Sequence, residues 1–294
     1  MVGFWEALDR QLGQRLGIPF SSQVRQPLGG GSINAAYRLV GEGGQFFVKL
    51  NRAERVEMFA AEAEGLREIQ ASQTIRVPTP ILWGCHEQSS YLVLEYLELG
   101  GRGSARQLGY DVAAMHRVRG SRFGWHRHNT IGATPQLNTW EGDWVHFYRQ
   151  HRLGYQVQLA RRYGGQWQQR VQWLLEHLEV FFRDYQPYPA LVHGDLWGGN
   201  YGYLPDGTPV IFDPAVYFGD AETDLAMTRL FGGFPESFYQ AYAEVIPPQP
   251  GWQERLPLYQ LYHLLNHLNL FGSGYLGQVI QAVEQCCAVV ARNM

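Results

Sequence analysis

The sequence predicts an α+β protein with two lobes, a small antiparallel sheet in the first lobe and mostly helices in the second. Short apolar segments with strand character, bounded by glycines and turn residues, are concentrated in the first hundred residues. Longer segments with helical periodicity follow them. Because strands come first and helices afterwards, this order favours an α+β arrangement. We place the first lobe at residues 1–97 and the second at 98–294.

The expected elements follow the hydrophobic patterns along the chain. The first lobe should hold an amphipathic N-terminal helix, a helix at 54–71, and strands at 24–28, 36–40, 45–50, 81–85 and 91–96. The second lobe should hold helices at 104–119, 140–163, 166–184, 234–244, 254–271 and 275–291.

The amino-acid composition limits the kinds of protein that this chain can be. The chain has 294 residues, 45% hydrophobic and 17% charged, with a net charge of −3. These values are typical of a globular protein and give no sign of a nucleic-acid or membrane partner. The N-terminal helix carries charged residues, unlike a signal peptide. The three cysteines fit a reducing compartment. We therefore expect a cytoplasmic protein, acting as a monomer.

Two features of the first lobe suit phosphate binding. The cluster Gly29, Gly30, Gly31 and Ser32 lies between two strands, where backbone amides can approach a polyphosphate closely. Lys49 lies within the apolar strand QFFVKL, where a lysine is unwelcome unless it is paired or functional. The alternatives are a plain glycine-rich hairpin and an edge-strand lysine that faces water.

The helix at 54–71 offers a partner for this lysine. At 100° per residue, Glu62 lies on the flank of the apolar stripe, whereas Glu57 and Glu64 lie well away from it. Glu62 is therefore the carboxylate best placed to turn inward and hold Lys49. Such a pair positions a lysine on the α- and β-phosphates of a nucleotide. The alternative is that Glu62 is solvated helix surface.

The stretch 191–213, LVHGDLWGGNYGYLPDGTPVIFD, carries the main chemistry. Its Asp-Gly turn predicts a hairpin that brings Asn200 next to Asp213. Asp195 precedes Asn200 by five residues on a glycine-rich loop. One carboxylate and one amide are suitable ligands for Mg²⁺, and a separate carboxylate can orient an attacking hydroxyl. Alone, each of these residues is more typical of a turn.

The second lobe offers candidates for substrate contact. The loop at 123–140 has aromatic and amide side chains that would wall a pocket, and we select Asn129 and Thr130 from it. Trp197, in the stretch 191–213, is the third candidate, and its ring would stack either on the substrate or on the loop at 129–140. We call the segment 193–200, which contains Asp195 and Asn200, the catalytic loop, and we expect His193 and Asp224 to brace it rather than react. The alternative for the loop at 123–140 is a surface connection.

In order, these motifs resemble the protein-kinase-like superfamily. The chain has HGD where protein kinases have HRD and DPA where they have DFG, and it lacks an activation-loop segment. These departures point to the small-molecule branch, which includes the aminoglycoside and choline phosphotransferases. The segment LEYLEL (94–99) resembles a kinase hinge, which implies that the carbonyl of Glu95 and the N–H of Leu97 pair with adenine.

A narrower resemblance is to the fructosamine-3-kinase (ketosamine-3-kinase) family. It is carried by GGGSIN (29–34), MFAAEAEGL (58–66), NTIGATPQLNTW (129–140), HGDLWGGN (193–200) and IFDPAVYFGDAETDLAM (211–227). It implies an ATP- and Mg²⁺-dependent kinase for the 3-hydroxyl of ketosamines, either small ribulosamine, erythrulosamine or fructosamine adducts or glycated lysines of proteins. Some members use a cysteine of the glycine-rich loop for redox-sensitive dimerisation; with Ser32 here, we expect no such switch.

The resemblance also implies roles for the candidates. Asp195 would accept or orient the proton of the sugar hydroxyl, Asn200 and Asp213 would hold Mg²⁺, and Lys49, fixed by Glu62, would bind phosphates. Two alternatives stay open. Another small-molecule kinase would keep the same catalytic residues and differ in its pocket. A non-catalytic nucleotide-binding module would be expected to lack at least one of them.

Overall fold

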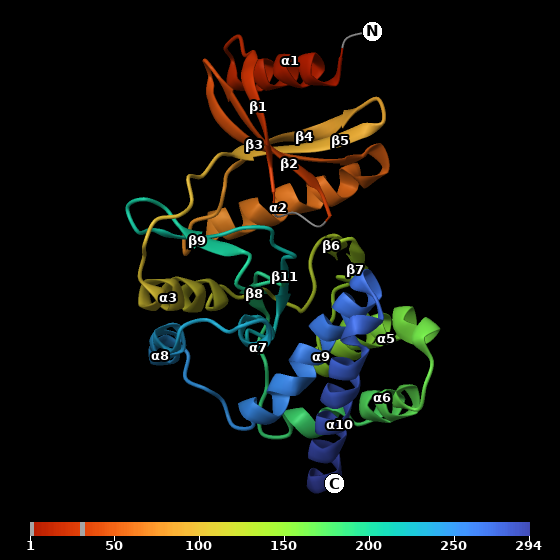
Figure 1. Ribbon diagram of the computed structural model, residues 1–294. Helices are drawn as coiled ribbons and strands as arrows, with labels where there is room; N and C mark the ends of the chain where they lie inside the picture. Colours follow the sequence, from red (N-terminus) through yellow and green to blue (C-terminus); the bar gives the residue numbers. More distant parts are fainter. Residues whose placement is uncertain (1–2, 30–32) are drawn as a thin grey trace. The chain divides into compact units, whose positions relative to one another are not determined.

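The computed structural model describes residues 3–29 and 33–294. The chain forms two compact units (Figure 1). The first consists of Met1–Gly103 with Gly202–Asp213, and the second of Ser104–Tyr201 with Pro214–Met294. The lobe boundary at residues 97 and 98 stays a prediction. The hairpin that follows the catalytic loop belongs to the first unit, because residues 202–213 pack mainly with that unit.

The first unit is built on a five-stranded antiparallel sheet, as the sequence predicts (Figure 1). In spatial order its strands are β1 (Ser22–Leu28), β2 (Ala35–Gly41), β3 (Gly44–Arg52), β5 (Ser89–Glu95) and β4 (Pro80–His86). The two helices of this unit are α1 (Phe4–Leu16) and α2 (Val56–Ser72).

The two faces of the sheet have different partners because side chains alternate along a strand. Phe46 and Val48 of β3 pack in a buried cluster with Leu8 and Leu12 of α1. Lys49, the next residue of β3, points to the opposite face, where it meets α2. One strand therefore supplies both the hydrophobic core under α1 and the polar group that faces α2.

The predicted hairpin of the catalytic stretch is present. Strands β9 (Tyr201–Tyr203) and β10 (Pro209–Ile211) form a two-stranded sheet. Gly207 in the turn has φ +86°, a left-handed conformation that favours glycine. The hairpin joins the first unit through backbone hydrogen bonds from Ile211 N to Arg76 O and from Gly101 N to Tyr203 O.

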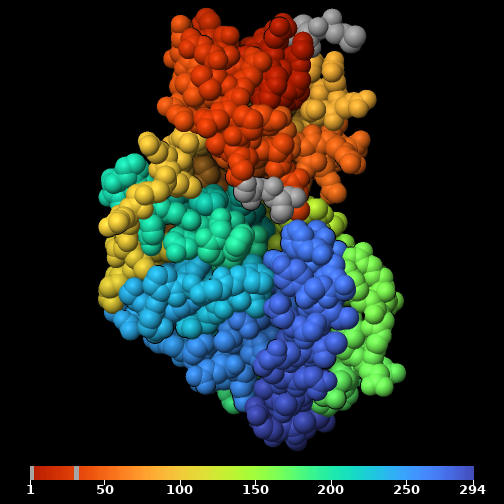
Figure 2. Space-filling view, viewed as in Figure 1, coloured from red at the N-terminus to blue at the C-terminus, as the bar shows by residue number. Residues whose placement is uncertain are grey.

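The second unit is mainly helical (Figure 1). Its helices are α3 (Ala105–His116), α4 (Trp144–Phe147), α5 (Gly154–Ala160), α6 (Trp167–Glu176), α7 (Glu222–Leu230), α8 (Glu236–Val245), α9 (Trp252–Phe271) and α10 (Leu276–Asn293). Two short strand pairs complete it: β8 (Ala190–Val192) with β11 (Tyr217–Gly219), and β6 (Asn129–Ile131) with β7 (Thr134–Gln136). Helices α9 and α10 pack together, and both reach the surface in Figure 2.

The predicted helix at 140–163 begins later, at Trp144, and changes its winding without a break in the helix. The segment divides into α4, a π-helical stretch Tyr148–Leu153, and α5. Arg152 lies in this π-helical stretch and is fully buried. Its guanidinium donates to the Asn138 side chain at 2.6 Å and lies 3.9 Å from the centre of the Tyr217 ring. A regular 3.6-residue pattern does not reveal such a change of winding. The helix predicted at 166–184 is shorter than expected: α6 ends at Glu176, and a 3₁₀ stretch, Leu178–Phe182, follows it.

None of the helices in the described residues is both long and apolar enough to cross a membrane.

The contact between α3 and α8 gives a test of the packing. Gly109 of α3 is buried, and a Cβ built on it would lie 2.4 Å from the carbonyl oxygen of Phe238. We expect Gly109→Ala to lower the free energy of unfolding by about 1–3 kcal/mol, because the two backbones must separate. Urea unfolding followed by circular dichroism measures this change.

The matched control is Gly277→Ala in α10, where an added Cβ meets nothing within 4 Å. This variant should be neutral or slightly more stable, since alanine favours the helix over glycine. Equal destabilisation by the two substitutions would contradict the close approach of α3 and α8.

Candidate active site

Lys49 is the centre of a buried ionic cluster in the first unit. Lys49 lies on strand β3 and its side chain is only 6% exposed. The ammonium donates to Glu62 Oε1 at 2.5 Å and to Asp213 Oδ1 at 2.7 Å. The structure therefore brings together three of the residues selected from the sequence, and Lys49 is not an edge-strand lysine facing water.

The charges of this cluster keep the lysine protonated. Burial alone would lower the pKa of Lys49, but the carboxylates of Asp213 and Glu62 outweigh it and hold that pKa above its usual value. Lys49 is thus a fixed positive charge at neutral pH. Such a group can bind phosphate oxygens, and it is unsuited to accept a proton from a substrate.

Asp213 differs from Glu62 in its exposure. The Asp213 side chain is 47% exposed, whereas that of Glu62 is 11% exposed. Asp213 also has φ +57°, a left-handed conformation uncommon for a residue other than glycine. Glu62 is therefore suited to fixing the lysine, and Asp213 retains an accessible carboxylate that suits a hard cation.

The glycine-rich segment is only partly described. Gly30, Gly31 and Ser32 lie outside the described residues, and Gly29, directly after β1, is exposed. The far end of the segment is tied to β3, because Asn51 Nδ2 donates to the side chain of Asn34 at 2.7 Å and to the backbone of residue 33 at 3.3 Å. The asparagines at 34 and 51 were not selected from the sequence.

The predicted hinge residues follow the end of β5. Glu95 is the last residue of this strand, and Leu97 lies two residues beyond it. The Glu95 carboxylate accepts hydrogen bonds from Arg76 and from Thr79 N. Burial raises the pKa of Glu95, but these donors outweigh it and leave the pKa below its usual value. The Glu95 side chain thus forms its hydrogen bonds inside the first unit. The adenine contacts of Glu95 O and Leu97 N stay predictions.

The catalytic loop of the second unit joins Asp195 and Asn200. Asn200 is 5% exposed, and its Nδ2 donates to the Asp195 backbone oxygen at 2.8 Å and to Asp195 Oδ2 at 3.2 Å. Because Nδ2 is the donor in both contacts, Oδ1 is the amide atom left for a cation. Between them, Trp197 is 38% exposed and meets the Phe231 ring nearly edge-on.

A buried carboxylate braces the start of this loop. Asp224 accepts hydrogen bonds from His193 N at 2.7 Å and Gly194 N at 2.8 Å, and His116 Nε2 lies 3.0 Å from it. Burial raises the pKa of Asp224, but its hydrogen bond and charge interaction with His116 outweigh it, and the pKa lies below its usual value. The arrangement matches the bracing expected for Asp224. The sequence offers no periodic signal that singles out His116 as its partner.

Gly194 has a structural reason to be glycine. Its φ is +83°, and a Cβ at this position would lie 2.1 Å from the Ala215 carbonyl oxygen. The backbone before Asp195 thus passes directly against the segment that follows Asp213 in the chain. This close approach explains why the residue before Asp195 is glycine.

The loop at 123–140 contains a buried hydrogen-bond network. Asn129 is 8% exposed; it donates to Val216 O at 2.8 Å and accepts from Gln136 and Asn138 at 2.9 and 2.8 Å. Its amide thus supports the backbone after Asp213. Thr130, next in β6, is half-buried and pairs with Pro135. The substrate contacts predicted for Asn129 and Thr130 stay predictions, and for Asn129 this network would have to rearrange.

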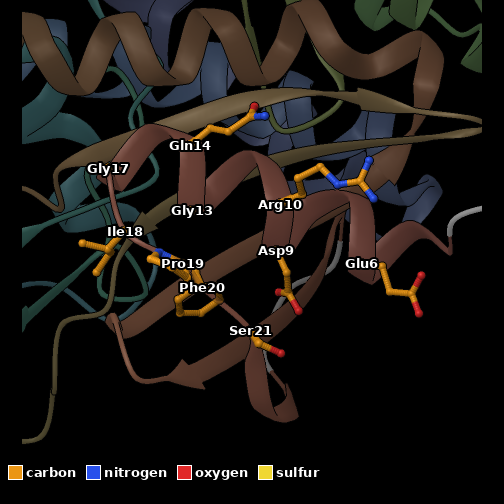
Figure 3. A pocket seen from close by; sticks show the side chains of 10 residues that line it. All are labelled: Glu6, Asp9, Arg10, Gly13, Gln14, Gly17, Ile18, Pro19, Phe20 and Ser21. Atoms are coloured by element: carbon orange, nitrogen blue, oxygen red, sulfur yellow. The ribbon is translucent and has the colours of Figure 1, made fainter.

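A separate surface groove of 640 Å³ lies along α1 (Figure 3). Its walls are α1 side chains such as Glu6, Asp9 and Arg10, and the segment 17–21 that follows the helix. None of the residues selected from the sequence lines it. The groove is therefore distinct from the candidate active site.

These features define the class of protein. An antiparallel sheet that carries a buried lysine–glutamate pair, followed by a helical unit with a D-x-x-x-x-N loop, is typical of protein-kinase-like phosphotransferases. A sequence model of the family described as fructosamine kinase matches residues 4–289. The chain belongs to the fructosamine kinase family.

Individual relatives agree with this assignment. The chain is 50% identical over 288 residues to a Synechocystis protein named a probable ketoamine kinase, covering 97% of each chain. It is 44% identical over 263 residues to the chloroplastic protein-ribulosamine 3-kinase of Arabidopsis thaliana, covering 87% of this chain and 80% of that protein.

Solved structures give the same fold. A Haemophilus somnus protein assigned as a fructosamine-3-kinase has a TM-score of 0.89 at 28% identity, with 97% of this chain and 98% of that chain covered. A mutant aminoglycoside phosphotransferase, solved with ADP and hygromycin B, has a TM-score of 0.60 at 17% identity, with 97% and 98% covered. The second likeness concerns the fold alone.

The Asp224 brace gives a test of the second unit. We expect Asp224→Asn to lower the free energy of unfolding by about 3 kcal/mol or more, because the new amide N–H₂ faces donors and the His193 and Gly194 N–H groups lose a charged acceptor. Urea unfolding at pH 7 measures this loss. The control is Glu244→Gln on α8, which removes the charge of an exposed carboxylate paired with Arg106. It should leave stability nearly unchanged, and equal losses would contradict the brace.

Proposed function

We propose that this protein transfers the γ-phosphoryl group of ATP to the 3-hydroxyl of a ketosamine. The observation that carries the proposal is the Lys49 cluster, a buried, permanently charged lysine held by two carboxylates. Membership of the fructosamine kinase family supports the reaction class. The names of the relatives, ketoamine kinase and ribulosamine 3-kinase, support the substrate class.

In this reaction the sugar hydroxyl oxygen forms a bond to the γ-phosphorus, and the bond from that phosphorus to the bridging oxygen of ADP breaks. The hydroxyl proton goes to Asp195, the carboxylate of the catalytic loop. Asn200 Nδ2 donates to this carboxylate and holds it in position. The protein forms no covalent intermediate, so its contribution is positioning and charge.

Lys49 binds the α- and β-phosphates, and Glu62 fixes its ammonium. The backbone of Gly29–Ser32 covers the phosphates, and Glu95 O and Leu97 N pair with adenine. These assignments rest on the order of the motifs in the chain.

The residues present suit Mg²⁺. The half-exposed carboxylate of Asp213 and the amide oxygen of Asn200 are the hard oxygen ligands that this ion prefers. When bound, Mg²⁺ would neutralise charge on the phosphates. The pairing of these two ligands is inferred from the hairpin that separates them in the sequence.

Trp197 would contact the sugar, since its exposed ring lies two residues after the proposed base. We include in the proposal a cytoplasmic location, a monomeric state, and activity on small ketosamines or glycated lysines.

Replacing the proposed base tests the mechanism. We expect Asp195→Asn to lower kcat about 10²- to 10⁴-fold with little change in the KM for ATP, because the amide cannot accept the hydroxyl proton. The measurement is phosphate transfer from labelled ATP to the ribulosamine of lysine in the presence of Mg²⁺. Turnover within about tenfold of the wild type would make the assignment of the base wrong.

The Lys49 cluster is tested by Glu62→Gln. The neutral amide should hold the ammonium less firmly, so kcat/KM for ATP should fall about 10- to 100-fold. The control is Glu57→Gln, the same substitution at an exposed position of the same helix, which should change kcat/KM less than about twofold. Equal kinetics of the two variants would argue against a positioning role for Glu62.

A further inference from the structure

A patch of aromatic rings adjoins the catalytic loop in the second unit. We call it the aromatic surface, and it consists of Phe231, His267, Phe271 and Tyr275. Phe231 follows α7, His267 and Phe271 lie in the last turns of α9, and Tyr275 ends the 3₁₀ turn before α10. Three separate segments thus converge on one patch.

The rings are in continuous contact. The centre of the His267 ring lies 4.7 Å from that of Phe231, 5.4 Å from that of Phe271 and 5.2 Å from that of Tyr275. Phe231 in turn meets Trp197 at 6.5 Å. Since Trp197 is two residues from Asp195, the contacts lead from the catalytic loop to the end of α9.

Core packing accounts for only part of this patch, in which Phe231, His267 and Tyr275 are half-buried. Phe271 is 49% exposed and Trp197 is 38% exposed. In the described residues of the second unit, the exposed large hydrophobic side chains are Trp197, Phe271 and Met294. Two of these three therefore belong to one chain of contacts. Exposed apolar groups that cluster in this way are typical of a binding surface.

The chemistry of the patch suits a cation with an alkyl chain. His267 Nδ1–H donates to His263 O at 2.8 Å, so Nε2 is the acceptor of the neutral ring. Burial lowers the pKa of His267 and outweighs the opposite effect of this hydrogen bond. The lowered pKa favours the neutral form of the ring. Aromatic faces and a neutral ring nitrogen attract an ammonium group, while the exposed Phe271 ring can pack against methylenes.

We propose that the aromatic surface binds the carrier amine of the ketosamine, namely the lysine side chain to which the sugar is attached. A ketosamine has a secondary ammonium next to its sugar, and the alkyl chain of the carrier continues from that nitrogen. With the sugar at Trp197, the ammonium and the chain extend over His267 and Phe271. This inference rests on the proposed function and adds the subsite that distinguishes lysine adducts from a bare aminosugar.

The test compares two substrates that share one sugar. One is the ribulosamine of α-N-acetyl-lysine, and the other is 1-amino-1-deoxyribulose, which has no carrier. For Phe271→Ala, we expect kcat/KM for the lysine adduct to fall about 5- to 30-fold, mainly through KM. The value for the carrier-free substrate should change less than about twofold. Phe271→Tyr, which keeps the ring, should restore the wild-type ratio.

The control variant is Val24→Ala on β1, which removes an apolar side chain that is 47% exposed in the other unit. It should leave both kinetic values unchanged, and urea unfolding checks that each variant is folded. Equal falls on both substrates, or no change on either, would overturn the subsite and leave the proposed function standing. If the wild type phosphorylates neither substrate, the subsite and the proposed function fail together.

Discussion

The buried ammonium of Lys49 is the interaction on which the candidate site depends. A lysine on the inner face of a sheet is costly unless its charge is paired, and here two carboxylates pair it. Glu62 comes from the helix after the strand, and Asp213 comes from the end of a hairpin far along the chain. The lysine therefore ties β3, α2 and the end of the hairpin to one point of the first unit.

The second unit uses a buried carboxylate in a corresponding way. Asp224 accepts backbone hydrogen bonds at the start of the catalytic loop and lies 3.0 Å from His116 Nε2. The loop then closes on itself, since the Asn200 amide returns to Asp195. In the first unit a carboxylate of low exposure holds a functional side chain, and in the second unit a buried carboxylate holds the backbone that leads into the catalytic loop. Both contacts fix the orientation of functional groups before any substrate binds.

Hydrophobic periodicity was sufficient to predict the elements that have a regular geometry. The place of Glu62 beside the apolar stripe of its helix was sufficient to select it over Glu57. The change of winding at 148–153 and the internal use of Asn129 were not predictable in this way. Both involve the buried polar residues Arg152 and Asn138, whose cited partners lie 14 and 9 residues away and follow no local period. His116 escaped selection for the same reason.

The most direct test of the central claim is to identify the product by phosphorus NMR after incubation of the wild-type protein with ATP, Mg²⁺ and the ribulosamine of α-N-acetyl-lysine. The account predicts a phosphate monoester on the 3-hydroxyl of the sugar, formed in equal amount to ADP. ADP accompanied only by free phosphate, or a monoester at another hydroxyl, would contradict it.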